Sequence, residues 1–243
     1  MDVFILTYKG IHYFDQWFKE TDFTSTTKFH IVDNGQQTIP ERLEHLVVHR
    51  TKVNTGCAGG WNISYRIGFE YLKLEKMIMG QDDAVVTQEY LDRVWNMSTP
   101  NLIVGLYENP VKWSVVGMHR DFYMNVGQFD ENCVYAFHED GDYENRMRMV
   151  GKSVISLGYD RRLNASLTSH LAWDWSRKNL SENGEYMHIK WGKSGEYNFP
   201  FNDSALKANS DAPIRPKVYE VYGKDITEFP SRTEYKRFLE NQI

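Results

Sequence analysis

Two groups of acidic residues have the types and spacing that could carry out chemistry. Asp82 and Asp83 directly follow a short apolar run. Glu139, Asp140 and Asp142 form a second acidic segment. Adjacent carboxylates are costly unless a cation or hydrogen bonds compensate them, and their hard oxygen atoms suit Mg²⁺ or Mn²⁺ held together with a diphosphate. Crowding in the second group raises the pKa of at least one carboxyl group and can poise a general base.

Each acidic group also fits a structural interpretation. The first fits an acidic turn after a strand, and the second fits a helix N-terminus, where acids interact favourably with the helix dipole. The glycine-rich connection from Asn54 to Asn62, which includes Gly60, permits close backbone approach to a ligand. It matches neither the GxGxxG fingerprint nor the P-loop, and a plain tight turn fits it equally well.

Alternating apolar segments must position these groups. The continuous apolar run at 3–8 predicts a strand covered on both faces, and 11–20 carries apolar residues at helical spacing. The remaining expected elements are strands at 28–32, 46–48 and 76–80 and a helix at 61–74. This alternation predicts an α/β fold with a mostly parallel central sheet flanked by helices, whose ligands bind beyond the carboxyl ends of the strands. Asp33, Asn54 and Asp82 fall at such ends.

The composition indicates one folded domain followed by an extension. The chain has 243 residues, of which 41% are hydrophobic and 14% aromatic, so it can bury a substantial core. Residues 173–243 are rich in Trp, Tyr, Asn, Lys and Gly and are interrupted by prolines. We therefore expect a binding and catalytic domain at 1–172 and an irregular C-terminal extension at 173–243 that packs on the same domain.

Cysteine content, hydropathy and charge narrow the class of protein. Cys57 and Cys133 belong to no Cys-x-x-Cys or Cys/His cluster, which argues against a disulfide framework or a structural zinc site. No signal peptide or membrane-spanning stretch is evident, so we expect a cytoplasmic protein. The net charge is −5, yet basic residues outnumber acidic ones at 146–193. That stretch would attract a diphosphate or a nucleic acid, or form a solvated basic face.

Taken together, the segments resemble the GT-A glycosyltransferases, particularly the family-2-like sugar transferases that are compared with rhamnosyltransferases. Five segments in the expected order carry the resemblance: Thr7-Tyr8, Ile31-Val32-Asp33-Asn34-Gly35, the Asn54 to Asn62 connection, Gln81-Asp82-Asp83 in place of Asp-x-Asp, and Val126–Glu131 followed by Glu139-Asp140-x-Asp142. The resemblance covers roughly residues 3–172. One departure is Gln81, which stands where the family often has an acidic residue or Asn.

The resemblance implies a GT-A (Rossmann-like) fold and an inverting, divalent-metal-assisted glycosyltransferase whose donor is a nucleoside diphosphate sugar. Asp140 would be the general base, and Glu139 and Asp142 would tune it or bind the acceptor. Mn²⁺ or Mg²⁺ would be held by Asp83, mainly, with Asp82 and His170. The nucleotide sugar would contact the remaining candidates, which are Thr7, Tyr8, Asp33, Asn54, Gly60, Asn62, Gln81, Asp82 and Arg146.

The acceptor stays open. The segment at 185–201 resembles an ending of small viral and bacterial sugar transferases, so one hypothesis is a phage-type enzyme that glycosylates hydroxymethylated pyrimidines in DNA. It would bind duplexes in a salt-sensitive way through Arg161, Arg162, Arg177 and Lys178. The other hypothesis is a cell-surface glycan.

Two other classes of protein are alternatives. A nucleotidyltransferase could use the same paired carboxylates, but the expected glycine-rich basic loop after the first strand is missing here. A role as a non-catalytic carbohydrate-binding protein would explain the aromatic content but would assign no function to the carboxylate clusters.

Overall fold

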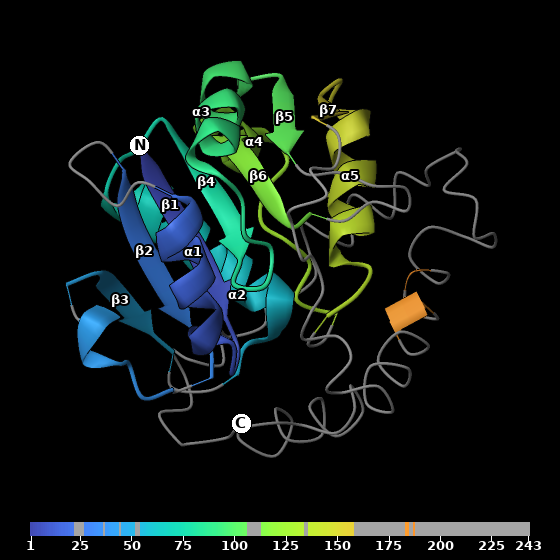
Figure 1. Ribbon diagram of the computed structural model, residues 1–243. Helices are drawn as coiled ribbons and strands as arrows, with labels where there is room; N and C mark the ends of the chain where they lie inside the picture. The colour runs from blue at the N-terminus through green and yellow to red at the C-terminus, as the bar shows by residue number, and fades with distance from the viewer. Residues whose placement is uncertain are drawn as a thin grey trace, which may run out of the picture.

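A single mixed sheet forms the centre of the protein. The computed structural model describes residues 1–21, 27–35, 37–43, 45–51, 54–105, 113–133, 136–157, 183–184 and 187. Within them, seven strands pair in the order β3-β2-β1-β4-β6-β5-β7 (Figure 1). The strands are β1 (Asp2–Thr7), β2 (Lys28–Asp33), β3 (Val47–Arg50), β4 (Lys76–Gln81), β5 (Leu102–Gly105), β6 (Val115–His119) and β7 (Ser153–Ser156). Only β6 runs antiparallel to its neighbours among these strands, so the predicted mostly parallel sheet is confirmed.

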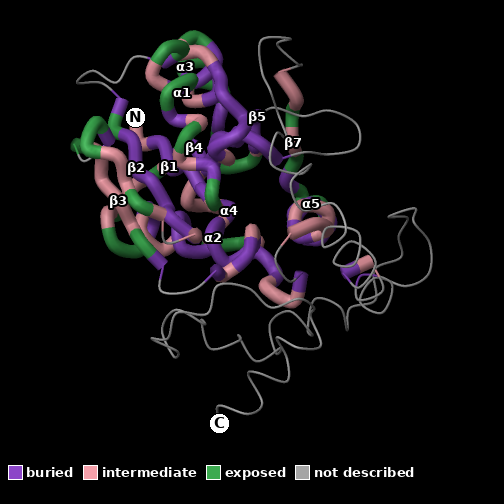
Figure 2. The backbone as a smooth tube through the Cα atoms, turned by 60° about the horizontal axis from the view of Figure 1, so that its bottom comes forward, coloured by how far each residue is buried: buried purple, intermediate pink, exposed green. Residues whose placement is uncertain are grey.

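Helices cover both faces of the sheet and create two cores. One face packs against α1 (Phe14–Glu20) and α3 (Gln88–Met97), and Figure 1 shows α1 in front of the sheet. The other face packs against α2 (Gly56–Tyr65), the π-helical η3 (Arg66–Tyr71), α4 (Arg120–Asn125) and α5 (Glu139–Met149). Two short 3₁₀ helices, η1 (Ile11–Tyr13) and η2 (Glu41–Leu43), complete the described elements. Figure 2 shows that the central strands β1 and β4 are mostly buried between these layers.

Both faces of strand β1 are buried, which explains its continuously apolar sequence. Val3 and Ile5 point into the core that contains α1, whereas Phe4 and Leu6 point into the core that contains α2. Successive side chains of a strand face opposite sides of the sheet, so a strand covered on both faces needs apolar residues at every position. The predicted doubly covered first strand is therefore confirmed.

The glycine-rich connection is helical, which corrects the expected start of the following helix at residue 61. Helix α2 begins at Gly56, whose φ of 73° lies in the left-handed region that favours glycine. A Cβ atom on Gly60 would lie 2.4 Å from the Leu6 Cδ1 atom on β1. The small residues thus let α2 approach the sheet closely, and this packing requirement explains Gly60 without a ligand.

The described part of the C-terminal extension is short. Asn183 is buried, and its Nδ2 atom donates hydrogen bonds to the carbonyls of Ala136 and Phe137 at 2.8 and 3.2 Å. The rest of the predicted extension lies outside the described residues. Within those residues, no helix combines the length and the apolar character that crossing a membrane requires.

Two histidines join β3, an edge strand of the described sheet, to its neighbour β2. His30 Nδ1 lies 3.1 Å from His49 Nε2, His30 Nε2 lies 3.0 Å from Asp2 Oδ1, and the His30 ring stacks on Phe4 with ring centres 4.2 Å apart. Burial, followed by the charges of His30 and Lys28, lowers the pKa of His49 to about 4. His49 is therefore neutral in the folded protein at neutral pH.

We expect acid to weaken the fold through His49. An unfolded histidine has a pKa of about 6.5, so the unfolded chain binds more protons than the folded chain between about pH 6.5 and 4, and the free energy of unfolding falls as the pH falls through that window. Urea unfolding at several pH values should show this loss, and His49→Gln should flatten it. The same change at exposed His12 is the matched control, and an unchanged slope in His49→Gln would contradict the assignment.

Candidate functional site

The carboxyl ends of β1, β2, β3 and β4 meet at one edge of the sheet because these strands run parallel. The strand register places Thr7 beside Asp33, and Asp33 beside Arg50. Asp82 continues β4, and its backbone amide donates to the Leu6 carbonyl at 3.0 Å. The fold therefore brings residues from distant parts of the sequence to one place.

Asp82 is a buried carboxyl group with few compensating contacts. Thr7 Oγ1 donates to Asp82 Oδ2 at 2.6 Å, and Trp17 Nε1 donates to the Asp82 carbonyl at 2.9 Å. Burial raises the pKa of Asp82 to about 7, the Thr7 hydrogen bond opposes this, and the charge of Asp83 adds to it. A Cβ atom on Gly10 would lie 2.0 Å from Asp82 Oδ2, so the loop after β1 passes directly over the carboxyl group and needs glycine there.

The fit of a divalent cation rests on two adjacent carboxyl groups. Asp83 is 3% exposed and Asp82 is 5% exposed. In the described part of the chain, no three His, Cys, Asp or Glu residues come together as a metal site, and His170 lies outside that part. Two hard carboxylates suit Mg²⁺ or Mn²⁺ that takes its remaining ligands from a diphosphate and water. The donor set of the described residues thus supplies two carboxylate ligands for such a cation.

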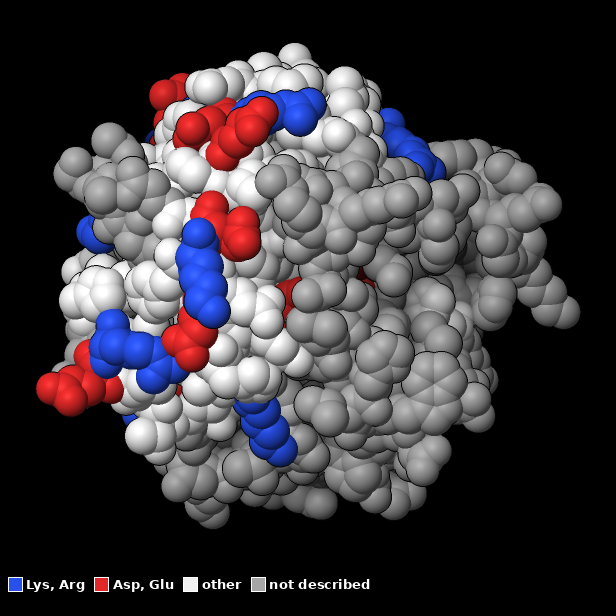
Figure 3. All heavy atoms as spheres, viewed as in Figure 1, with Lys and Arg blue, Asp and Glu red and all other residues white. Residues whose placement is uncertain are grey.

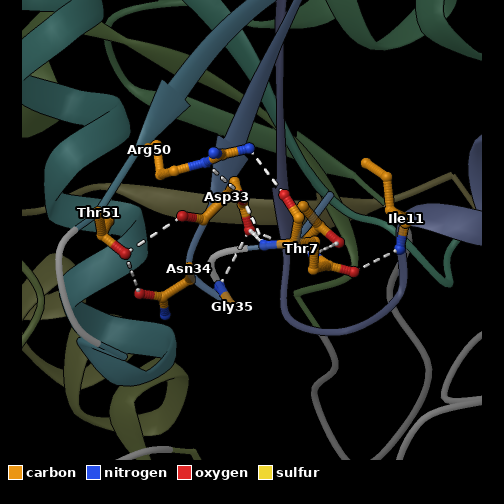
Figure 4. Close-up of polar contacts among 8 residues, drawn as sticks. Thr7, Ile11, Asp33, Asn34, Gly35, Arg50 and Thr51 are labelled. Carbon is orange, nitrogen blue, oxygen red and sulfur yellow. Dashed lines mark hydrogen bonds and ion pairs between the residues drawn. The ribbon is translucent and has the colours of Figure 1, made fainter. Parts of the chain in front are cut away.

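Asp33 is fully engaged by the protein itself. Its carboxylate accepts hydrogen bonds from Gly35 N, Gln37 N and Gln37 Nε2 at 2.9–3.2 Å, and it forms an ion pair with Arg50 Nε at 3.0 Å (Figure 4). The Asp33 side chain is fully buried, whereas that of Arg50 is 49% exposed. Gln37 Nε2 also donates to Thr7 Oγ1 at 3.1 Å. Asp33 thus holds the loop after β2, and the partly exposed Arg50 side chain lies beside it at this edge.

The asparagine side chains of the glycine-rich segment form hydrogen bonds within the protein. Asn54 Oδ1 accepts from Gly56 N at 2.9 Å and from Asn34 Nδ2 at 3.1 Å. Asn62 exchanges hydrogen bonds with the Phe129 backbone at 2.8 and 3.0 Å, and its Nδ2 atom donates to Glu131 at 2.8 Å. Asn54 therefore holds the start of α2, and Asn62 ties α2 to the loop before α5.

Tyr8 lies at the same edge, directly after β1. It is partly buried, and Lys9 Nζ lies 5.0 Å from the centre of its ring. Lys9 has a φ of 59°, a left-handed conformation that is uncommon for a residue other than glycine.

Cys57 connects the two acidic groups. Gln81 Nε2 donates to Cys57 Sγ at 3.8 Å, and the Glu139 carboxyl group acts on the Cys57 thiol electrostatically. Burial raises the pKa of the Cys57 thiol, and the charges of Glu139, Asp140 and Asp83 raise it further. The thiol thus lies within electrostatic reach of both groups.

Glu139 and Asp140 form the first turn of α5. Glu139 is 6% exposed, and its Oε2 atom is buried without a hydrogen-bond partner. Asp140 is partly exposed and its Oδ1 atom accepts from Gly141 N at 2.7 Å. Burial raises the pKa of both carboxyl groups, and the charge of Asp140 raises that of Glu139 further. Phe137 and His138, directly before the helix, have φ values of 78° and 73°, so backbone strain accompanies these acids.

Asp142 and Arg146 form a buried ion pair one turn further along α5. Arg146 Nε donates to Asp142 Oδ2 at 2.8 Å, and Arg146 Nη1 donates to the Val126 carbonyl at 2.7 Å. The Asp142 side chain is 0% exposed and the Arg146 side chain is 5% exposed. Their contacts join α5 to the loop at 126–130, so both residues stabilise the fold around the site.

Several residues of this site escaped the sequence analysis. Cys57 has no partner cysteine in any sequence motif, and Arg50 and Gln37 belong to no motif. Asn34 belongs to the predicted turn after β2, and its Oδ1 atom accepts from Thr55 N at 2.8 Å. A preference of Asn for backbone-bonding turns was the one signal that could have marked it.

Surface charge is mixed in the described residues. On the face in Figure 3, acidic and basic side chains lie in groups of both signs rather than in a patch of one sign. The four basic residues proposed to contact DNA, Arg161, Arg162, Arg177 and Lys178, lie outside the described residues.

We expect Asp142→Ala to destabilise the protein by about 3–5 kcal/mol, because it leaves the buried Arg146 charge without its partner. The double variant Asp142→Leu with Arg146→Met removes both charges and should recover a large part of this loss. Denaturant unfolding of the single and double variants measures the coupling between the two residues. Additive effects, or a stable Asp142→Ala variant, would contradict a structural role for the pair.

Comparisons with known proteins identify the fold. No protein-family model and no curated protein sequence matches the chain. Among solved structures, GalNAc-T7 with UDP, GalNAc and Mn²⁺ aligns with 99% of this chain and 54% of its own, at 12% identity and a TM-score of 0.52. A candidate nucleotide-diphospho-sugar transferase from Desulfovibrio desulfuricans G20 aligns with 76% of this chain and 97% of its own, at 10% identity and a TM-score of 0.49. The galactosyltransferase LgtC, with donor and acceptor sugar analogues, aligns with 64% of this chain and 73% of its own, at 13% identity and a TM-score of 0.42.

The chain spans about half the length of GalNAc-T7, and at this identity the likeness establishes the fold alone. The α/β, GT-A-type architecture predicted from the sequence is confirmed.

Proposed function

We propose that this protein is a glycosyltransferase that moves a sugar from a nucleoside diphosphate sugar to an acceptor hydroxyl. The observation that carries the proposal is the placement of two carboxyl pairs, Asp82–Asp83 and Glu139–Asp140, around Cys57 beyond the carboxyl ends of the parallel strands. Ligands of open α/β sheets bind at that edge. The fold shared with GalNAc-T7, a protein solved with UDP, GalNAc and Mn²⁺, supports the proposal.

The first pair suits the diphosphate. Asp83 and Asp82 would hold Mg²⁺ or Mn²⁺, which supplies positive charge that neutralises the leaving diphosphate. Thr7 keeps the Asp82 carboxyl group oriented through its 2.6 Å hydrogen bond. The exposed side chain of Arg50 offers a further positive charge to the nucleotide at the end of β3.

The second pair suits the acceptor. Asp140 is the residue of the pair that is partly exposed, whereas Glu139 is buried. The raised pKa of Asp140 makes it a stronger base than an ordinary aspartate. A base and a leaving group on opposite sides of the sugar favour direct displacement with inversion. Hydroxymethylated pyrimidines in DNA and surface glycans both offer a hydroxyl for this reaction.

Donor binding should depend on a divalent cation. We expect one class among UDP-, GDP-, dTDP- and CDP-linked sugars to raise the melting temperature with Mn²⁺ or Mg²⁺ and not with EDTA, since a ligand at 100 times its Kd adds about 2.7 kcal/mol of stability. Asp83→Asn should abolish the metal-dependent rise in melting temperature. Asp92→Asn on α3 is the matched control and should retain it. A protein that no nucleotide sugar stabilises would contradict the proposal.

Transfer should depend on the Asp140 carboxylate. Asp140→Asn should reduce turnover by at least about 100-fold, the contribution typical of a general base, and leave donor affinity within about twofold. Both quantities are measured with the donor and metal that the melting experiments identify, using donor hydrolysis as the readout if the acceptor is not yet known.

The pH dependence of turnover gives a second test. A base acts only when it is ionised, and the pKa of Asp140 is raised, so turnover should fall as the pH falls through a value above the ordinary aspartate pKa of about 3.9. Full turnover by Asp140→Asn would exclude Asp140 as the base.

A further inference from the structure

Three charged residues form a stripe along one face of α5. Asp140, Glu144 and Arg148 follow one another at intervals of four residues within this helix. Residues at this spacing lie one above another on an α-helix, with their Cβ atoms about 5–6 Å apart. The stripe therefore begins at the general base assigned under the proposed function, on which this inference rests.

Glu144 is held inside the protein by two donors. Its side chain is 3% exposed. Trp113 Nε1 donates to Glu144 Oε1 at 2.9 Å, and Arg148 Nη2 donates to Glu144 Oε2 at 3.1 Å. An indole N–H and a guanidinium can only donate, so both hydrogen bonds favour the ionised form of Glu144. Burial raises the pKa of Glu144, and these two partners oppose the rise. The contacts thus favour a negative charge at a place that is nearly closed to water.

Trp113 ties this charge to the end of β4. The indole packs edge-on against Tyr143 and Phe129, with ring centres 5.3 and 5.7 Å apart, and Trp113 is 4% exposed. The carbonyl of the next residue, Ser114, accepts a hydrogen bond from Gln81 N at 2.9 Å. Rotation of α5 about its axis would break the bond between Trp113 and Glu144. The bond therefore fixes the orientation of the helix that carries Asp140.

The charged and titratable groups around Asp140 come from α5, from the residue before it and from α2. Among the described residues they are Glu139, Glu144, His138 and the Cys57 thiol. Burial raises the pKa of Asp140, a hydrogen bond from the next backbone amide opposes the rise, and the charge of Glu144 adds to it. A nearby negative charge disfavours ionisation of a carboxyl group and so makes the carboxylate a stronger base.

We propose that Glu144, held by Trp113, is a positioning residue for the general base: it keeps a negative charge one helical turn from Asp140 and thereby strengthens Asp140 as a proton acceptor. In the transfer step the proton of the acceptor hydroxyl moves to Asp140 and the hydroxyl oxygen bonds the anomeric carbon. The diphosphate leaves with the electron pair of the broken bond. Glu144 acts on this step through Asp140 rather than on the substrates.

The pH profile of turnover tests this role. Turnover is measured with UDP-, GDP-, dTDP- and CDP-linked sugars and Mn²⁺, and release of the nucleoside diphosphate is the readout. Glu144→Gln keeps an acceptor for Trp113 and removes the charge, so the acidic limb of the kcat profile should move to lower pH by about half a pH unit or more. KM for the sugar nucleotide should stay within about twofold. Glu89→Gln, which removes an exposed carboxylate on α3, is the matched control and should leave the limb in place.

Two further variants separate the effect of charge from a general loss of structure. Trp113→Phe keeps an aromatic ring and removes the Nε1 donor, so the acidic limb should again move to lower pH. Combining it with Glu144→Gln should add little, because both changes act through the same charge. Arg148→Met removes a positive charge beside Glu144 and should move the limb to higher pH. The Arg148 side chain is 45% exposed, so this variant covers the case in which the variants of buried residues do not fold.

The outcomes distinguish the inference from the function on which it rests. An active wild-type protein whose acidic limb stays in place in Glu144→Gln would overturn the role of Glu144 and leave the proposed function standing. The same conclusion follows if Arg148→Met leaves the limb unchanged or moves it to lower pH. A wild-type protein that turns over no sugar nucleotide would overturn the proposed function together with this inference.

Discussion

Carboxyl groups shielded from water at one edge of the sheet set the main physical constraint on this protein. A buried carboxylate must find a partner or take up a proton, because the low-dielectric interior penalises its charge. Asp33 and Asp142 find partners in Arg50 and Arg146. Asp82 and Glu139 instead have raised pKa values.

These two solutions distinguish the ion-paired acids from the acids with raised pKa values. The paired acids hold loops: Asp33 organises the turn after β2, and Asp142 joins α5 to the segment before it. Asp82 has a hydrogen bond from Thr7 but no cationic partner, and Glu139 keeps one buried oxygen atom without a hydrogen bond. Incompletely compensated buried acids cost stability, and such costs are common at functional sites.

The fold was predictable from the sequence because its signals are local. The apolar run at 3–8 alternates between two cores, so its composition already indicated a strand covered on both faces. The sequence of the glycine-rich segment is ambiguous, since glycines permit both an open ligand-binding loop and a close helix contact. Only the distance between Gly60 and Leu6 distinguishes the two.

The sequence by itself determined the alternating strands and helices up to β4 and the acidic clusters at strand and helix ends, because hydrophobic periodicity and turn residues act over a few neighbours. Tertiary structure alone decided which polar side chains form hydrogen bonds with other parts of the protein. Asp33, Asn54 and Asn62 occupy motif positions, but their side chains form hydrogen bonds within the protein. Cys57 belongs to no recognised functional motif, and acids of both pairs act on its thiol electrostatically. Burial and pairing depend on contacts between residues far apart in the chain, and no local pattern encodes them.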